Sequence, residues 1–238
     1  MAKIGGTKHL KRIAVPKAIP ITNKKEKTWI INHSPGPHSK RSSIPLAVLM
    51  REILGFAKTA REVKKILNAR LVQVDGKVVV EPAYPVGLFD VIHFSKLEKS
   101  YQINVDGKAR LTPVEVASKS DKKILKVLGK NVLPKAKVNL SLHDGKNIFA
   151  DNHVKVGDSV MLNLKDKKIE KILKLEKGAT CLIIEGKHAG TVAKLEGIIE
   201  RKEGKPSEAK LSYKDGEFIT VAKYLFVVDD HFVGVSHE

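Results

Sequence analysis

Apolar positions along residues 43–96 follow two helical repeats and then change to strand-like runs. A first helix is predicted from Pro45, which suits its first turn, to Gly55, which suits its C-terminal cap. Its apolar residues recur three and four positions apart, as in one face of an amphipathic helix. They are Leu46, Leu49, Met50, Ile53 and Leu54.

A second helix begins in the sequence "TARE". Thr59 is placed to cap it, and Glu62, three residues later, completes a capping box. One face is apolar and the other carries long polar side chains without an acid. The apolar face is Ala60, Val63, Ile66 and Leu67, and the polar face is Arg61, Lys64, Lys65 and Asn68.

The remaining pattern is mostly that of strands and turns. "LVQVDGKVVV" predicts a hairpin at Asp75-Gly76, and "PVGLFDVIHF" predicts one strand over 85–94. Residues 119–128 predict a helix that ends at Gly129, and residues 154–164 predict a Gly-Asp turn followed by a buried strand. Two further strands flank the glycine-bracketed loop 186–190 in "ATCLIIEGKHAGTVAKLEGIIE". The fold class is therefore an α+β N-terminal module followed by mainly β domains.

Charge divides the chain further. The net charge is +18, of which residues 1–42 carry +9, residues 43–96 +3, residues 97–170 +6 and residues 171–238 zero. We predict a basic N-terminal arm over 1–42, domains over 43–96 and 97–170, and a β-barrel-like domain over 171–238. The arm contains four prolines and no apolar periodicity, so we expect it to be extended and disordered until it binds RNA.

Motifs for other functions are missing from the sequence. It contains no dinucleotide-binding or nucleoside-triphosphate-binding glycine motif and no nucleophile elbow. Its one cysteine, Cys181, excludes a disulfide framework and is expected in a core. The sequence contains no run of 18 apolar residues, so we expect no membrane-spanning segment. We expect no catalytic residue, no metal, no cofactor and no small-molecule substrate.

A large positive charge favours a nucleic-acid partner. Aromatic residues make up only 5% of the chain, so phosphate and ribose contacts to folded RNA are expected to outweigh base stacking. In "HSPGPHSKRSS", we expect His33, Ser34 and His38 to donate hydrogen bonds to RNA, while Lys40 and Arg41 supply charge.

The segments also resemble known RNA-binding modules. The two helices with "TAREVKKIL" and the "VDGK" hairpin resemble the S4 RNA-binding domain, and "GKHAGTVA" resembles the KOW motif. Together with "KHLKRIAVPK", "SPGPHSKRSSIPL", "PVGLFDVI" and "LHDGKNI", their order resembles the S4e family of the archaeal and eukaryotic small ribosomal subunit.

The resemblance implies a cytoplasmic, non-catalytic constituent of the small ribosomal subunit, with ribosomal RNA and neighbouring ribosomal proteins as partners. A KOW-containing translation or transcription factor and a non-catalytic part of an RNA-modifying system remain alternatives. The expected RNA-binding residues are Lys8, His9, Lys11, Arg12, His33, Ser34, His38, Lys40, Arg41, Arg51, Lys58, Thr59, Arg61, Lys64, Lys65, Asn68, Arg70, Lys77, Lys187 and His188.

Overall fold

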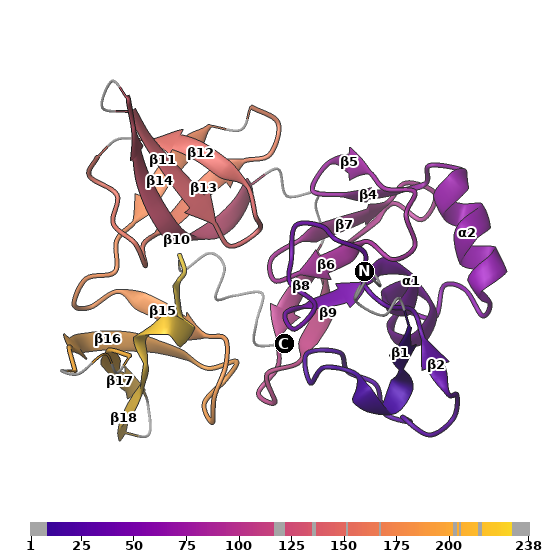
Figure 1. Ribbon diagram of the computed structural model, residues 1–238, viewed down its shortest axis with the longest axis horizontal. Helices are drawn as coiled ribbons and strands as arrows, with labels where there is room; N and C mark the ends of the chain where they lie inside the picture. The colour runs from indigo at the N-terminus through magenta and orange to yellow at the C-terminus, as the bar shows by residue number, and fades with distance from the viewer. Residues whose placement is uncertain are drawn as a thin grey trace, which may run out of the picture. The chain divides into compact units, whose positions relative to one another are not determined.

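The protein is described by a computed structural model in which the chain forms two compact units (Figure 1). The structure describes residues 9–116, 122–134, 137–150, 152–166, 168–201, 204, 206–213 and 216–229. Unit 1 comprises Met1–Ile103 and Arg110–Glu115, and unit 2 comprises Asn104–Ala109 and Val116–Glu238. The four-part division of the sequence stays a prediction.

Both predicted helices are present in unit 1. The first is α1 (Leu46–Val48), which continues directly into a π-helical turn, Leu49–Ile53. Pro45 lies before it as an extended N-cap residue rather than in its first turn, and Gly55 has a φ of 69° after its end. The second helix is α2 (Ala60–Asn68), on which Val63 and Leu67 are buried.

A five-stranded sheet lies beside these helices in the chain, with the strand order β5-β4-β7-β8-β9. Its strands are β4 (Val72–Val74), β5 (Lys77–Val78), β7 (Val91–Phe94), β8 (Lys99–Val105) and β9 (Leu111–Val116). Asp75 and Gly76 both have positive φ, as a type I′ hairpin requires. The single strand predicted over 85–94 is instead two, β6 (Pro85–Gly87) and β7, because Phe89 turns the chain with a φ of 62°.

The N-terminal segment is folded onto unit 1 from residue 9. It forms β1 (Leu10–Lys11) and β2 (Trp29–Ile30), which pair with each other, and a 3-10 turn at Arg12–Ala14. The amide of Leu111 on β9 donates to the carbonyl of Ala18 at 2.8 Å. Five apolar side chains of the segment are buried: Leu10, Val15, Ile19, Ile21 and Ile30. The expectation of an extended, disordered arm is therefore wrong for residues 9–42. The sequence did not indicate these five buried side chains because their spacing follows neither a helical nor a strand period.

The "SPGPHSK" segment crosses β6, which pairs with β3 (Ser43–Pro45). A Cβ on Gly36 would lie 2.7 Å from the ring of Pro85, and a Cβ on Gly87 would lie 2.4 Å from the ring of His38. The amide of Ser34 donates to the carbonyl of Ala83 at 2.9 Å. The lack of a side chain at Gly36 and Gly87 therefore lets the segment pack closely against β6.

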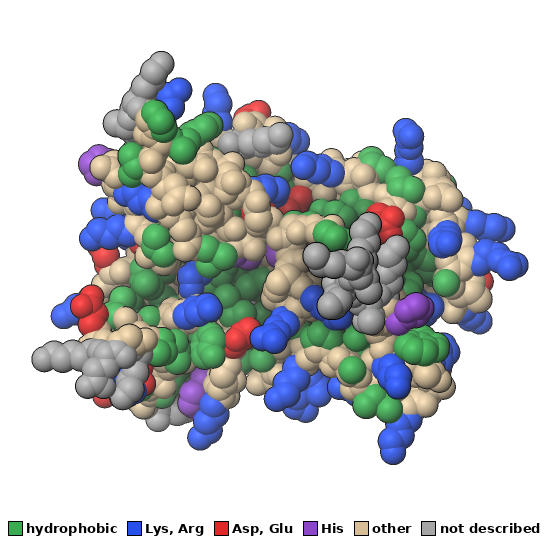
Figure 2. Space-filling view, viewed as in Figure 1, with side chains coloured by type: hydrophobic (Ala, Val, Ile, Leu, Met, Phe, Trp, Pro, Cys, Tyr) green, Lys and Arg blue, Asp and Glu red, His purple; other side chains and the backbone are tan. Residues whose placement is uncertain are grey.

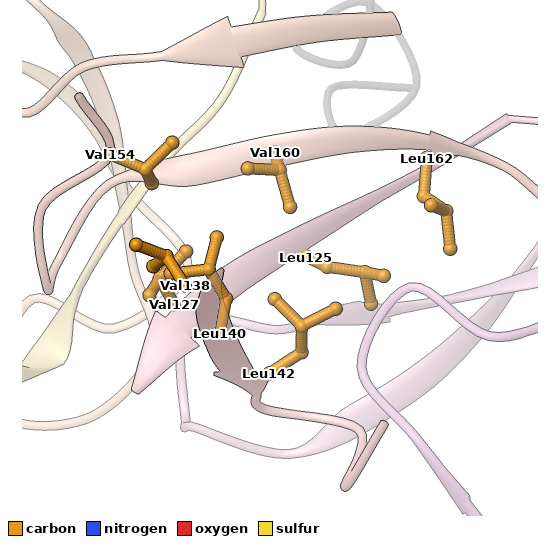
Figure 3. Packing of buried hydrophobic residues seen from close by; sticks show 8 residues of the cluster. All are labelled: Leu125, Val127, Val138, Leu140, Leu142, Val154, Val160 and Leu162. Atoms are coloured by element: carbon orange, nitrogen blue, oxygen red, sulfur yellow. The ribbon is translucent and has the colours of Figure 1, made fainter. Parts of the chain in front are cut away.

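Unit 2 contains two five-stranded antiparallel sheets. The first has the order β12-β11-β10-β13-β14 and encloses eight buried apolar residues (Figure 3). Its strands are β10 (Lys122–Leu133), β11 (Lys137–Leu142), β12 (Asn147–Ala150), β13 (Ser159–Asn163) and β14 (Ile169–Leu173). The predicted helix over 119–128 is wrong where the structure describes it, because β10 occupies residues 122–133. The strand predicted after Gly157 is β13.

The second sheet has the order β18-β17-β16-β15-β19. Its strands are β15 (Thr180–Ile183), β16 (Val192–Ile199), β17 (Glu208–Tyr213), β18 (Gly216–Val221) and β19 (Leu225–Val227). Cys181 is buried in its core, as expected. The strands on both sides of the 186–190 loop are β15 and β16, which confirms the prediction for this segment.

Candidate nucleic-acid interface

The polar face of α2 is a continuous basic surface. Because Val63 and Leu67 are buried, the residues on the opposite side of the helix point to solvent, and Arg61, Lys64, Lys65 and Asn68 are all exposed. Within the described part of the chain, none of the three cations forms an ion pair with a carboxylate. Lys and Arg side chains gather over α2 in Figure 2. Four donors at this spacing cover about 10 Å of helix.

The N-terminus of α2 is closed by its own capping box. Thr59 Oγ1 accepts from the amide of Glu62 at 3.2 Å, while the Glu62 carboxylate accepts from the amides of Lys58 at 2.8 Å and Thr59 at 3.3 Å. The backbone hydrogen bond from Lys58 and the bonds from Thr59 hold the pKa of Glu62 below its ordinary value. The amides of Lys58 and Thr59 are therefore already bonded within the capping box: Thr59 caps the helix, and Lys58 presents its exposed side chain to solvent.

Two further cations follow α2 along the chain. Arg70 is exposed in the turn after the helix and has a left-handed φ of 57°. Lys77 is exposed at the start of β5, directly after the Asp75-Gly76 turn. Both belong to the helix–turn–hairpin segment that carries the α2 face, so the basic surface continues past the end of the helix.

The N-terminal candidates fall into exposed and buried groups. His9, Lys11, Lys40 and Arg41 are exposed, whereas Arg12 is only 3% exposed. Lys8 lies outside the described residues. Burial of Arg12 removes it from any surface that RNA can reach, so its assignment as an RNA contact is corrected to a structural role.

Arg12 and Arg51 share one carboxylate. The Arg12 guanidinium donates to Glu52 at 2.8 Å and also donates from its Nε to the carbonyl of Asn23. Arg51 donates to the same carboxylate at 2.7 Å and is itself half-buried. Burial alone raises the pKa of Glu52, but the hydrogen bonds and charges of the two arginines outweigh it and hold this pKa below its ordinary value. Arg51 is thus also engaged within the fold.

The three candidates of the "HSPGPHSK" segment serve its packing. His38 is buried and its Nε2 lies 3.1 Å from Asp90 Oδ1, whose other oxygen accepts from the amide of Gly87 at 2.8 Å. His33 Nε2 lies 2.9 Å from the carbonyl of Ser43, and burial lowers the pKa of its ring. Ser34 is half-buried and bonded through its backbone. The buried His38 is therefore held by an internal contact, whereas RNA contacts by the half-buried His33 and Ser34 stay predictions.

Family models match three consecutive parts of the chain: the RS4NT domain at residues 4–41, the S4 domain at 44–92 and the ribosomal family S4e at 97–169. A small ribosomal subunit protein eS4 from Methanosphaera stadtmanae is 42% identical over 96% of this chain and 95% of its own length. The chain belongs to the S4e family of ribosomal proteins.

Two further members support the same assignment. The eS4 protein of Archaeoglobus fulgidus is 39% identical over 92% of each chain. The crystal structure of the 30S ribosomal protein S4e from Thermoplasma acidophilum aligns with a TM-score of 0.68 and 30% identity, covering 79% of this chain and 95% of that one. The fold of this S4e member is thus the family's fold over most of its length.

The glycine-bracketed loop of this S4e chain presents one of its two candidates. Lys187 is exposed, whereas His188 is half-buried and stacks on Phe218 with ring centroids 4.3 Å apart and an angle of 22°. A Cβ on Gly190 would lie 2.8 Å from the backbone of Asp106, so the loop packs closely against that turn. The likeness of this loop to the KOW motif stays a prediction.

The C-terminal sheet neutralises its own cations. Arg201 pairs with Glu208 at 2.6 Å, and Lys210 pairs with both Glu196 and Glu217. The zero net charge of residues 171–238 thus reflects cations that are paired with nearby acids. This surface is therefore a weak candidate for an RNA-binding site.

The described residues show neither a metal site nor a membrane-spanning helix. They contain no group of three or more His, Cys, Asp or Glu side chains that could hold a metal ion. They also contain no helix that is both long and apolar enough to cross a membrane.

One exposed aromatic residue, Trp29, is not among the candidates predicted from the sequence. The signal that could have indicated it is a lone tryptophan in the basic stretch "KKEKTW".

Proposed function

We propose that this protein is a structural, non-catalytic constituent of the cytoplasmic small ribosomal subunit and that it binds folded ribosomal RNA. The observation that carries the proposal is the α2 face, where four donors are exposed and its three cations form no ion pair with any carboxylate of the described residues. Positive side chains on such a face bind successive phosphates and release counterions. Membership of the S4e family supports the same role.

The proposed interface consists of the candidates that remain on the surface. It is centred on α2 and extends along the chain through the exposed cations before and after it. Its members are His9, Lys11, Lys40, Arg41, Lys58, Arg61, Lys64, Lys65, Asn68, Arg70 and Lys77, with Lys187 as a separate contact in unit 2.

The test is the double variant Arg61→Ala, Lys65→Ala, measured by filter binding to a transcript of archaeal small-subunit ribosomal RNA at several salt concentrations. We expect the affinity to fall by about 1–3 kcal/mol and the salt slope to decrease by about two, because two phosphate contacts are lost. Stability should change little, since both side chains are exposed.

A control of equal charge is Arg201→Ala, Lys210→Ala, which removes two cations that acids already neutralise. Its affinity should stay close to that of the parent. If both variants bind equally well, the α2 face does not bind RNA.

The proposed role differs from that of a transient translation or transcription factor in how the protein is held. Sedimentation of a lysate separates the two. A subunit constituent stays with the small subunit after a high-salt wash, whereas a transient factor is released to the top of the gradient.

A further inference from the structure

The ribbon formed by β1 and β2 has one apolar and one exposed face. Leu10 pairs with Ile30, and both are buried against unit 1. Because side chains alternate along a strand, the next pair, Lys11 and Trp29, projects from the opposite face, and both are exposed. His9 is two residues from Lys11 and is exposed as well.

Trp29 is unusual among these residues because it is 53% exposed and is the only tryptophan of the chain. Tryptophan is on average highly buried, so an exposed one leaves a large apolar surface in water. The His9 ring contacts it with centroids 5.6 Å apart and an angle of 59°. The His9 ring is thus tilted and does not lie flat on the face of the indole. In Figure 2, histidine and hydrophobic side chains adjoin on the surface over β1 and β2.

The surroundings of Trp29 are strongly positive. Lys11 lies across the ribbon, and Lys25 and Lys27 are exposed just before the strand. The only acid among residues 1–42 is Glu26, which lies 3.4 Å from Lys27 and 3.9 Å from Arg12. A ligand that suits this face has a flat apolar part for the indole and negative charge for the lysines. An unpaired nucleotide meets both requirements.

We propose that Trp29 is a stacking site for an unpaired RNA base, with Lys11 bound to an adjacent phosphate. This inference rests on the proposed RNA-binding function and adds to it a site that reads single-stranded RNA. Every base has an aromatic face, so the site selects unpaired over paired nucleotides more than one base over another.

The single tryptophan makes the site directly observable. Full-length protein is titrated with a dodecamer of oligoadenylate and with an abasic ribose-phosphate dodecamer of the same charge, while Trp29 emission is recorded. We expect oligoadenylate to quench the emission at least twofold and the abasic strand to leave it nearly unchanged, because only a base stacks on the indole. Equal emission in the two titrations overturns the proposal.

Variants distinguish stacking from general apolar contact. Anisotropy of labelled oligoadenylate should show that Trp29→Leu lowers affinity about 5- to 150-fold, the range for loss of one stacked base, and that Trp29→Phe restores most of it. Ile13 is 70% exposed in the same segment, so Ile13→Ala should bind like the parent. An equal loss in the Ile13 variant and no rescue by Phe would show that general apolar contact, and not stacking on an aromatic ring, holds the RNA, and would overturn the proposal.

The two proposals fail in different ways. If Trp29 does not stack on RNA, the structured transcript still binds with the salt slope that depends on Arg61 and Lys65. If the protein binds neither the transcript nor oligoadenylate at moderate salt, the RNA-binding function itself is wrong. Circular dichroism melting verifies that each Trp29 variant is folded.

Discussion

At the scale of single residues, several predicted RNA contacts are internal supports of unit 1. The clearest is Arg12, whose side chain is 4% exposed and pairs with Glu52 at 2.7 Å. Sequence gives the positive charge of such a residue but not its partner, because Glu52 is 40 positions away. Distant pairing, not composition, decides whether a cation faces RNA or the fold.

We expect Glu52→Gln to lower the free energy of unfolding by about 3 kcal/mol at pH 7, because Arg12 loses its charged partner in a buried position. The matched control is Glu26→Gln, since Glu26 is 51% exposed and 3.9 Å from Arg12, and it should cost less than about 1 kcal/mol. Urea titration followed by circular dichroism measures both. Equal costs would show that the burial of the pair does not matter.

The pH dependence of the same pair has a defined sign. The pKa of Glu52 is held below its ordinary value in the folded protein, so the unfolded chain binds a proton there more readily. The stabilisation is complete above the ordinary pKa of 4.5 and is lost as the pH falls through the lower folded value. The parent should therefore lose stability over this acidic range more steeply than Glu52→Gln.

Gly87 gives a second prediction at this scale. A Cβ there would lie 2.4–2.6 Å from ring atoms of His38, so Gly87→Ala should push the imidazole away from Asp90 and cost about 1–3 kcal/mol. In a His38→Ala background the same change should cost much less, because the ring is gone. Thermal melting of the four proteins checks this, and additive costs would contradict the packing explanation.

At the scale of elements, sequence predicted α2 and its hairpin well because the signals are local. The capping box lies within four residues, and Asp75-Gly76 alone specifies the turn. The failure at β10 has the opposite cause. Lys123 to Val127 are all buried, so the strand has no polar–apolar alternation, and its lysines at 123 and 126 mimic the spacing of a helix.

Those buried lysines are accommodated by distant groups. Lys126 donates to the carbonyls of Lys223 and Leu225, and burial lowers its pKa to about 8. Lys123 is fully buried with its Nζ 3.9 Å from Asp144, which also binds Lys146 at 2.7 Å. Burial acts to raise the pKa of Asp144, but these two lysines outweigh it and keep the pKa below its ordinary value.

We expect Asp144→Asn to destabilise unit 2 by about 3 kcal/mol at pH 7, because the charge of Lys123 then lacks its carboxylate in the core. Lys146→Met is the control: this side chain is 34% exposed, so its removal should cost about 1 kcal/mol or less. Urea unfolding, monitored by amide exchange in β10, measures the difference between the two variants in the free energy of unfolding of unit 2. A cost confined to the Lys146 variant would contradict the role of Lys123.

At the scale of the whole molecule, charge indicated the class of partner, and folding determined which charges remain available. The α2 face was predictable because one amphipathic helix specifies both its buried and its exposed sides. The positions of the N-terminal candidates were not predictable, because apolar residues in 1–42 follow no helical or strand period. The buried side chains of this segment pack against surfaces that form only in the folded unit. Trp29 was missed because a low aromatic content says nothing about the exposure of one ring.

Removal of residues 1–42 tests this view of the N-terminal segment. An extended, disordered arm of the kind expected from the sequence could be removed without unfolding the remaining domains. The structure predicts otherwise, because the deletion exposes the apolar surface under Leu10, Val15 and Ile30 and leaves Glu52 without Arg12. We therefore expect the truncated chain to lose cooperative unfolding of unit 1 while amide protection in β10, β11 and β16 of unit 2 persists.

A full-length variant with Lys24, Lys25 and Lys27 changed to Ala removes positive charge but no buried side chain, so it should stay folded with a smaller salt slope for RNA binding. Unchanged protection in α2 and β7 of the truncated chain would show that the segment is a dispensable arm after all.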